Sequence, residues 1–228
     1  MKILKSFKLL TRFELCLWIS SVIVVSLSYL LSPDKNILSI LVSVIGVTAL
    51  IFIAKGLLLG QFLGITFAIL YGVISFFFKY YGETMTYLLM SAPTTIAATI
   101  QWYKNPYKKT MEVEVNKISK KQLFLTALLS LAVTFVFYFI LKALYTTNLI
   151  FSTISVATSF FAASLTYLRS PYYALAYAAN DIVLIVLWIL ASIADHSYIP
   201  MIFCFVMFLF NDLYGYINWK RMMKKQNT

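Results

Sequence analysis

Charged and metal-binding side chains are scarce in this sequence. Only 12% of the 228 residues are charged, and there are one histidine and two cysteines. A soluble domain carries about 25% charged residues, so this chain is not expected to be one. Cys16 and Cys204 lie in apolar stretches, and His196 stands beside Asp195 in a short polar segment. Because none of these positions has the spacing of a metal site, we expect no metal and no other cofactor.

Long apolar runs make up most of what is present. Hydrophobic residues account for 61% of the chain, and the mean hydropathy is +0.85. A helix needs about 20 apolar residues to cross the hydrocarbon of a bilayer. The sequence therefore predicts an all-helical integral membrane protein with about eight transmembrane helices. The predicted spans cover residues 13–31, 37–54, 56–78, 84–102, 122–144, 149–168, 171–193 and 198–219.

Basic residues predict the orientation of these spans. Lys and Arg accumulate in loops on the cytoplasmic side of a membrane. If both termini are cytoplasmic, only Lys35, Lys79 and Lys142 of the 19 basic residues lie outside. We therefore predict a multi-pass protein of the cell membrane with both termini in the cytoplasm. This topology and the attraction to anionic lipids account for the net charge of +11, so no nucleic acid partner is implied.

Short matches between the two halves suggest a duplication. The motif Ile-Gln-Trp at 100–102 ends the fourth predicted span, as Ile-Asn-Trp at 217–219 ends the last. The predicted divisions are an extra N-terminal helix (13–31), repeat 1 (37–102), a linker helix (122–144) and repeat 2 (149–219) within one membrane domain (1–228). Because a single span links the repeats, they are expected to be parallel to each other.

Two Asn-Asp pairs inside apolar runs mark the predicted site. Asn180-Asp181 is followed after six residues by Trp188, and Asn211-Asp212 by Trp219. A charged group at the bilayer centre costs about 3 kcal/mol or more, and such groups usually line a substrate path. At about 1.5 Å per residue, the pairs lie roughly 14 and 10 Å from the cytoplasmic ends of their helices. They share one layer, which predicts a transporter with a central polar site.

Different roles for these residues stay open. Two carboxylates at one depth repel each other, so a proton or a cationic substrate is expected between Asp181 and Asp212, unless each one ties two helices together. Trp188 is expected on the outer side of the layer. Both substrate binding and anchoring at the membrane interface fit Trp219, because Lys220 follows it directly.

A proline predicts a break in the fourth span. Pro93 lies near its middle, where the missing N–H and the ring should kink the helix and free a carbonyl group. The hydroxyl groups of Ser91, Thr94 and Thr95 are near enough in sequence to compensate. Counted by depth, Thr94 and Thr95 also fall near the layer of the Asn-Asp pairs, together with Thr66.

Four segments carry a resemblance to a known family. They are AANDIVLIVLW at 178–188, AKGLLLGQ at 54–61, YYGE at 80–83 and WYKN at 102–105. Their context resembles the PnuC-type nicotinamide riboside transporters over about residues 37–225. The resemblance implies two parallel three-helix repeats joined by a linker helix, as in the SWEET sugar transporters. It also implies facilitated diffusion without a coupling ion, with a separate cytoplasmic kinase that phosphorylates the substrate. A homo-oligomer is compatible with this fold.

The polar layer and the resemblance together select the expected binding residues. They are Asn180, Asp181, Trp188, Asn211, Asp212, Tyr216 and Trp219, with Gln61 and Gln101 as further candidates. The pyridinium ring of nicotinamide riboside is flat and cationic, so aromatic faces attract it. The amides of Asn and Gln both donate and accept hydrogen bonds, which suits its carboxamide.

Other functions remain as alternatives. The family commonly has Trp where this chain has Tyr216, and its relatives include carriers of thiamine or riboflavin, so these vitamins stay open as substrates. Proton-coupled uptake through Asp181 or Asp212 is also open. The sequence lacks a nucleophile–base pair and a phosphate loop, which argues against a membrane enzyme. A scaffold without transport leaves the buried aspartates unexplained.

Overall fold

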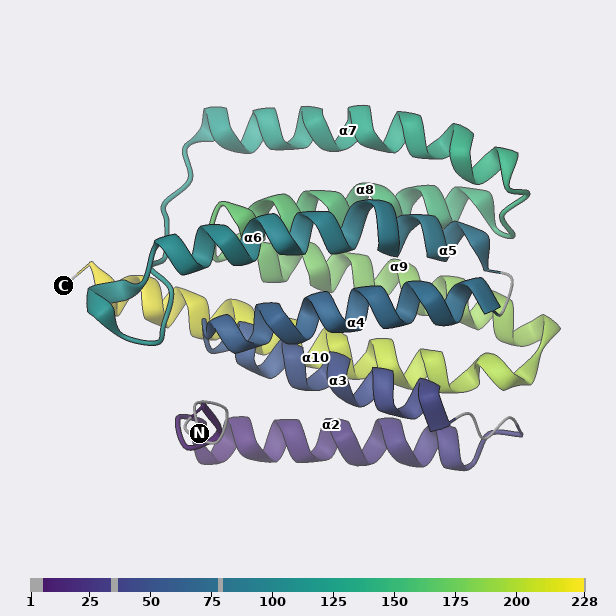
Figure 1. The fold of residues 1–228 in the computed structure, drawn as a ribbon, viewed down its shortest axis with the longest axis horizontal. Coiled ribbons are helices and arrows are strands. Elements are labelled where there is room, and N and C mark those ends of the chain that lie inside the picture. Colours follow the sequence, from purple (N-terminus) through teal and green to yellow (C-terminus); the bar gives the residue numbers. More distant parts are fainter. Residues whose placement is uncertain (1–5, 34–36, 78–79, 228) are drawn as a thin grey trace.

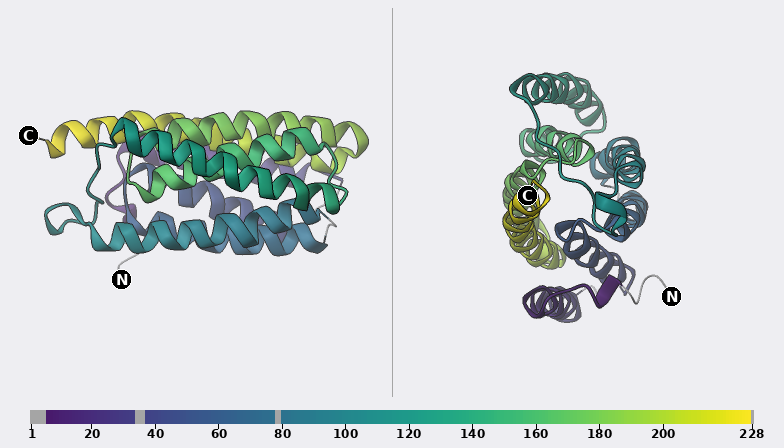
Figure 2. Two further views of the ribbon diagram at one scale, coloured as in Figure 1. Left: turned by 90° about the horizontal axis from the view of Figure 1, so that it is seen from above. Right: turned by 90° about the vertical axis from the view of Figure 1, so that its left-hand side faces the viewer.

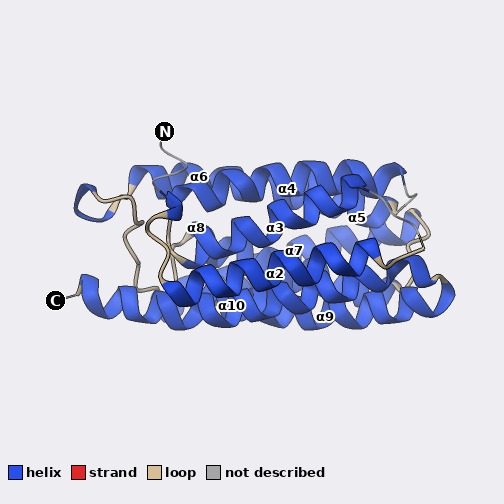
Figure 3. Ribbon diagram, turned by 90° about the horizontal axis from the view of Figure 1, so that it is seen from below, coloured by secondary structure: helices blue, strands red, loops and turns tan. Residues whose placement is uncertain are grey.

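The computed structural model describes residues 6–33, 37–77 and 80–227, and all of its regular elements are helices. Lys2, Lys5, Lys35 and Lys79, which enter the predicted topology, lie outside these ranges. Figures 1 and 3 show that the long helices run side by side along one axis. Among the described residues, seven helices are long and apolar enough to cross a membrane. They are α2 (Arg12–Leu30), α3 (Ile37–Ala54), α4 (Leu58–Phe77), α7 (Lys120–Ala143), α8 (Leu149–Tyr167), α9 (Tyr172–Ala194) and α10 (Ile199–Gln226), the last preceded by the short η3 (His196–Tyr198).

The fourth predicted span differs from the others. It consists of three consecutive pieces, α5 (Tyr81–Met85), the π-helical η1 (Thr86–Ser91) and α6 (Ala92–Lys104). Seven of the eight predicted spans are therefore long helices, and the fourth, for which Pro93 predicts a kink, is this composite of three pieces. Pro93 lies in the first turn of α6, and because it has no N–H it cannot close the preceding α-turn.

Threonine hydroxyls bond two carbonyl groups beside this break. The Thr94 hydroxyl donates to the Met90 carbonyl at 2.7 Å, and the Thr95 hydroxyl donates to the Ser91 carbonyl at 2.7 Å. A buried carbonyl group without a partner costs free energy. The hydroxyls therefore stabilise the wider π-turn inside the bundle.

Helices α2 and α7 lie at opposite ends of the bundle's cross-section (Figure 2). Helix α7, the predicted linker, packs mainly on α8 and exposes many large apolar side chains. Examples are Phe124, Leu128, Leu131, Phe135 and Phe139. An exposed surface of this composition suits contact with lipid chains.

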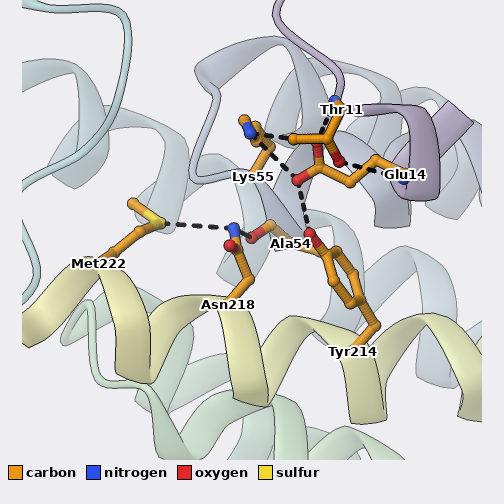
Figure 4. Close-up of polar contacts among 7 residues, drawn as sticks. All are labelled: Thr11, Glu14, Ala54, Lys55, Tyr214, Asn218 and Met222. Carbon is orange, nitrogen blue, oxygen red and sulfur yellow. Dashed lines mark hydrogen bonds and ion pairs between the residues drawn. The ribbon is translucent and has the colours of Figure 1, made fainter.

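A buried ion pair attaches α2 to the rest of the bundle (Figure 4). Both carboxylate oxygens of Glu14 lie 3.1 Å from the Lys55 ammonium nitrogen, and the Tyr214 hydroxyl donates to one of them at 2.7 Å. The Thr11 N–H donates to the other oxygen at 2.6 Å, as part of a capping box. The Glu14 side chain is fully buried. Helix α2 is thus joined to the end of α3 by an ion pair and to α10 by a hydrogen bond, as well as by packing.

Helices α3 and α8 end in the same way. Gly56 and Arg169 follow them with φ of 71° and 57°. In each case the next residue closes a six-residue turn, with the Leu57 N–H donating to the Phe52 carbonyl at 2.9 Å, and the Ser170 N–H donating to its counterpart in α8 at 3.0 Å. This backbone pattern is the Schellman end of a helix. A Cβ at Gly56 would lie 2.5 Å from the Met222 methyl carbon, so a larger residue there would displace the end of the Met222 side chain and would adopt a left-handed backbone that glycine tolerates best.

Candidate substrate site

A cavity of about 110 Å³ lies in the middle of the bundle, between α3, α4 and η1–α6 on one side and α8, α9 and α10 on the other. We call it the central cavity. The polar side chains that line it are Gln61, Tyr87, Ser91, Thr94, Thr95, Ser159, Thr166, Tyr173, Tyr177, Asn180, Asp181 and Asp212. Polar groups gathered inside an apolar bundle are typical of a site that binds a polar molecule.

Asn180 is held in one orientation. Its carbonyl oxygen accepts hydrogen bonds from the hydroxyls of Thr158 at 2.8 Å, Ser159 at 3.0 Å and Ser155 at 3.3 Å, all from α8. Three bonds to one oxygen fix the plane of the amide. Its NH₂ group takes no part in these three bonds and is the donor that remains for a molecule in the central cavity.

Asp181 and Asp212 bring two carboxyl groups together from neighbouring helices. Both side chains are buried, and the two carboxyl groups lie within hydrogen-bonding reach of each other. Among the described residues, one oxygen of Asp181 has no hydrogen-bond partner. Neighbouring buried carboxylates repel unless a proton or a cation lies between them. The pair is therefore suited to hold a positive charge.

Gln61 presents a second free amide to the central cavity. It lies in the first turn of α4 and is 1% exposed, and its NH₂ group has no partner among the described residues. A buried donor without a partner costs about 1–3 kcal/mol, which a bound acceptor would recover. Of the nine residues selected from the sequence, Asn180, Asp181, Asp212 and Gln61 converge on this cavity.

Asn211 faces away from the central cavity. Its NH₂ group donates to the Ser21 hydroxyl of α2 at 3.0 Å and to the Met207 carbonyl at 2.7 Å. Successive residues of a helix point about 100° apart, so Asp212 can face the cavity while Asn211 faces α2. The two Asn-Asp pairs share a depth but not an orientation.

Trp219 lies in the core near the C-terminal end of the bundle. It is fully buried, which rules out the expected contact with the membrane interface. Its indole N–H donates to the Ile53 carbonyl at 2.9 Å, while the Trp102 indole N–H donates to the Thr166 carbonyl at 2.9 Å. Each acceptor is the second-last residue of its helix, α3 or α8. The two ring centroids are 5.2 Å apart, so the pair closes this end of the core.

Three further positions named from the sequence also lie outside the lining of the central cavity. Gln101 belongs to the last turns of α6, and Tyr216 lies beside Tyr172 with ring centroids 6.2 Å apart. Thr66 is exposed on the outer face of α4, where its hydroxyl donates to the Phe62 carbonyl at 3.0 Å. These side chains do not reach the Asn180 amide.

Trp188 lines a different and larger cavity, of about 500 Å³, at the other end of the bundle. We call it the end cavity. Its rim includes the α9–α10 turn, where the Ser197 N–H donates to the Asp195 carboxylate at 2.9 Å. This backbone hydrogen bond holds the pKa of Asp195 below its usual value. The aromatic walls of the end cavity come from Trp188, Tyr80 and Tyr198.

Aromatic side chains separate the two cavities. Tyr71 lines the end cavity, whereas Phe67 and Tyr87 line the central cavity. The ring of Tyr71 lies 4.4 Å from that of Tyr87 and 5.5 Å from that of Phe67. Tyr87 and Phe67 were not selected from the sequence. The 17% aromatic content hides them, and the π-turn that carries Tyr87 has no motif of its own.

Comparisons with known proteins agree with this arrangement. A family model described as nicotinamide mononucleotide transporter matches residues 36–221. The chain belongs to this family. A relative, the nicotinamide riboside transporter PnuC of Neisseria mucosa, is 28% identical over 204 residues, which are 87% of this chain and 77% of that protein. A solved structure, the crystal structure of the vitamin B3 transporter PnuC, aligns with a TM-score of 0.81 at 27% identity, and the match covers 95% of this chain and 94% of that one.

Membership of the nicotinamide mononucleotide transporter family confirms the PnuC-type resemblance. The chain is thus a multi-pass membrane transporter for a small molecule. The relatives are named as transporters, which is consistent with transport rather than catalysis.

Proposed function

We propose that this transporter takes up nicotinamide riboside across the cell membrane by facilitated diffusion. The observation that carries the proposal is the convergence of the Asn180 amide, the Gln61 amide and the Asp181–Asp212 carboxyl pair on one buried cavity. The name of the relative from Neisseria mucosa supports the choice of substrate.

The chemistry of nicotinamide riboside matches these groups one by one. Its pyridinium ring carries a permanent positive charge, which the carboxyl pair would balance. Its carboxamide and ribose hydroxyls need hydrogen-bond partners, for which the amides of Asn180 and Gln61 are available. The rings of Tyr87 and Tyr177 border the same cavity and offer faces for the flat cation. We assign Asn211, Tyr216, Trp219 and Gln101 to packing around the site.

The proposal includes two parallel repeats with both termini in the cytoplasm. Lys and Arg residues of the described α6–α7 loop and the C-terminal end support this orientation. The paired bonds from Trp102 to α8 and from Trp219 to α3 support equivalent repeats. A cytoplasmic kinase that phosphorylates the substrate would keep uptake running without a coupling ion. Several copies of the chain together are compatible with its exposed apolar surfaces.

Proton-coupled uptake is the second candidate, because Asp181 and Asp212 adjoin each other and could share a proton. Purified protein in liposomes separates the two. Facilitated diffusion predicts that labelled nicotinamide riboside equilibrates across the liposome membrane without a pH gradient. Accumulation above equilibrium that requires a pH gradient would establish coupling instead.

Competition assays address the choice of vitamin. Unlabelled nicotinamide riboside should block the flux at lower concentrations than thiamine or riboflavin. Liposomes with the Asp181→Asn protein serve as a matched control for the role of charge. This variant keeps the shape of the side chain and removes its charge, so its flux of nicotinamide riboside should be lower. Absence of flux for all three vitamins in the unaltered protein would refute the proposed function.

A further inference from the structure

We propose that the end cavity is a second binding site, which holds a flat organic cation of the nicotinamide riboside class before it passes to the central cavity. This inference rests on the proposed function. It assigns a role to Trp188, which lies outside the central cavity, and to the acidic turn between α9 and α10.

Three aromatic rings form one wall of the end cavity. The ring centroid of Trp188 lies 5.7 Å from that of Tyr80 and 5.7 Å from that of Tyr198, and the two tyrosine rings are 5.2 Å apart. Each ring comes from a different part of the bundle, namely α9, the start of α5 and η3. Clustered aromatic faces are the arrangement that binds organic cations in proteins.

The carboxylate of Asp195 lies beside this aromatic wall. Among the described residues that line the end cavity, Asp195 is the only charged one. The Ser197 N–H keeps the pKa of this carboxyl low, so that it stays ionised at neutral pH. A carboxylate next to aromatic faces selects a cationic ring over a neutral one of the same shape.

An unused donor points to a ligand with polar groups. Trp188 is 3% exposed, and its indole N–H has no hydrogen-bond partner among the described residues. Indole nitrogens usually find a partner when they are buried. The hydroxyl of Ser75 lines the same cavity. A carboxamide or ribose oxygen is the acceptor that would satisfy the indole.

The volume of the end cavity suits a substrate that binds there before it reaches the central cavity. Pockets for small organic molecules measure about 300–1,000 Å³. The end cavity, at about 500 Å³, falls in this range, and the central cavity, at about 110 Å³, falls below it. In this conformation the substrate therefore fits in the end cavity but not in the central cavity, which lies on the other side of the aromatic layer of Phe67, Tyr71 and Tyr87. Opening of that layer would move the cation from Asp195 towards the Asp181–Asp212 pair.

Binding stoichiometry tests the inference. The purified full-length protein is titrated calorimetrically with nicotinamide riboside, with 1-methylnicotinamide as a flat cation without ribose, and with neutral nicotinamide. We expect two sites per chain for nicotinamide riboside. Asn180→Ala should weaken the central site about tenfold and leave the affinity of the end-cavity site unchanged. The end-cavity site should bind 1-methylnicotinamide but not nicotinamide.

Variants at the end cavity supply the complementary result. Trp188→Leu should weaken this site about tenfold, through loss of cation–π attraction. Asp195→Asn should weaken it about threefold and preserve folding, because Asp195 is exposed and asparagine also caps a helix well. Glu112→Gln, which removes a negative charge at the opposite end of the bundle, should change neither site.

The possible outcomes separate this inference from the proposed function. A single site per chain that Asn180→Ala weakens and Asp195→Asn leaves unchanged would overturn the end-cavity site alone. No binding of nicotinamide riboside to the unaltered protein would overturn the proposed function and this inference with it. A second site that binds nicotinamide as well as its methylated cation would contradict the role of charge.

Discussion

The two asparagines of the Asn-Asp pairs differ in what they contact. Three hydroxyls of α8 donate to the Asn180 carbonyl oxygen, and its NH₂ group remains for the central cavity. The NH₂ group of Asn211 instead donates to α2 and to its own helix. Sequence alone assigned both to binding. Depth follows from the helical rise, but orientation does not, because apolar residues face both lipid and protein neighbours in a membrane bundle.

Substitution of the two asparagines should therefore give opposite results. Asn180→Ala is expected to weaken nicotinamide riboside binding about tenfold with little change in stability, since it removes a ligand contact of about 1 kcal/mol or more. Asn211→Ala is expected to lower the free energy of unfolding by about 1 kcal/mol and keep the affinity. Calorimetric titration and thermal unfolding monitored by circular dichroism measure the two effects. Equal losses of affinity would show that both asparagines face the substrate.

The carboxyl pair should discriminate by charge. We expect Asp212→Asn to weaken the binding of nicotinamide riboside about tenfold, because the amide keeps the shape and loses the attraction for the pyridinium ring. Asn180 and Gln61 still bond the carboxamide, so the affinity for neutral nicotinamide should change little. The ratio of the two affinities is the measured quantity. A ratio that stays constant would mean that the carboxyl pair holds helices together and not the cation.

At the scale of helices, the sequence predicts the ends of most elements well. The predicted linker 122–144 corresponds to α7 at Lys120–Ala143, and the predicted 149–168 corresponds to α8 at Leu149–Tyr167. Hydrophobic length controls these elements. The composite α5–η1–α6 was expected as one kinked span. Its π-turn depends on how Thr94 and Thr95 bond the carbonyls near Pro93, which a hydropathy pattern does not contain.

The ion pair of α2 allows a test of how an element is attached. Glu14→Gln should destabilise the protein by about 3 kcal/mol, because it leaves the Lys55 ammonium group without its buried partner. The double variant Glu14→Gln with Lys55→Met should recover part of this loss. Thermal unfolding of the two single variants and the double variant gives the coupling energy. Additive effects of the two substitutions would show that Lys55 and Glu14 act independently.

At the scale of the whole molecule, closure differs between the two ends. The indole pair of Trp102 and Trp219 closes the core near the C-terminal end, whereas the opposite end contains the large end cavity. A transporter with alternating access has one end open at a time. With both termini in the cytoplasm, this conformation would present its cavity to the outside, from which uptake begins.

The orientation is testable in intact cells. In a background without Cys16 and Cys204, we expect His196→Cys to react with a membrane-impermeant thiol reagent, because the α9–α10 turn would lie outside. Lys117→Cys, in the exposed loop before α7, should react only after the cells are permeabilised. The order of labelling thus reports the side of each loop, and labelling of denatured protein controls for expression. Reaction of Lys117→Cys in intact cells would show that the topology is the reverse of the one proposed. The end cavity would then face the cytoplasm and receive substrate from there.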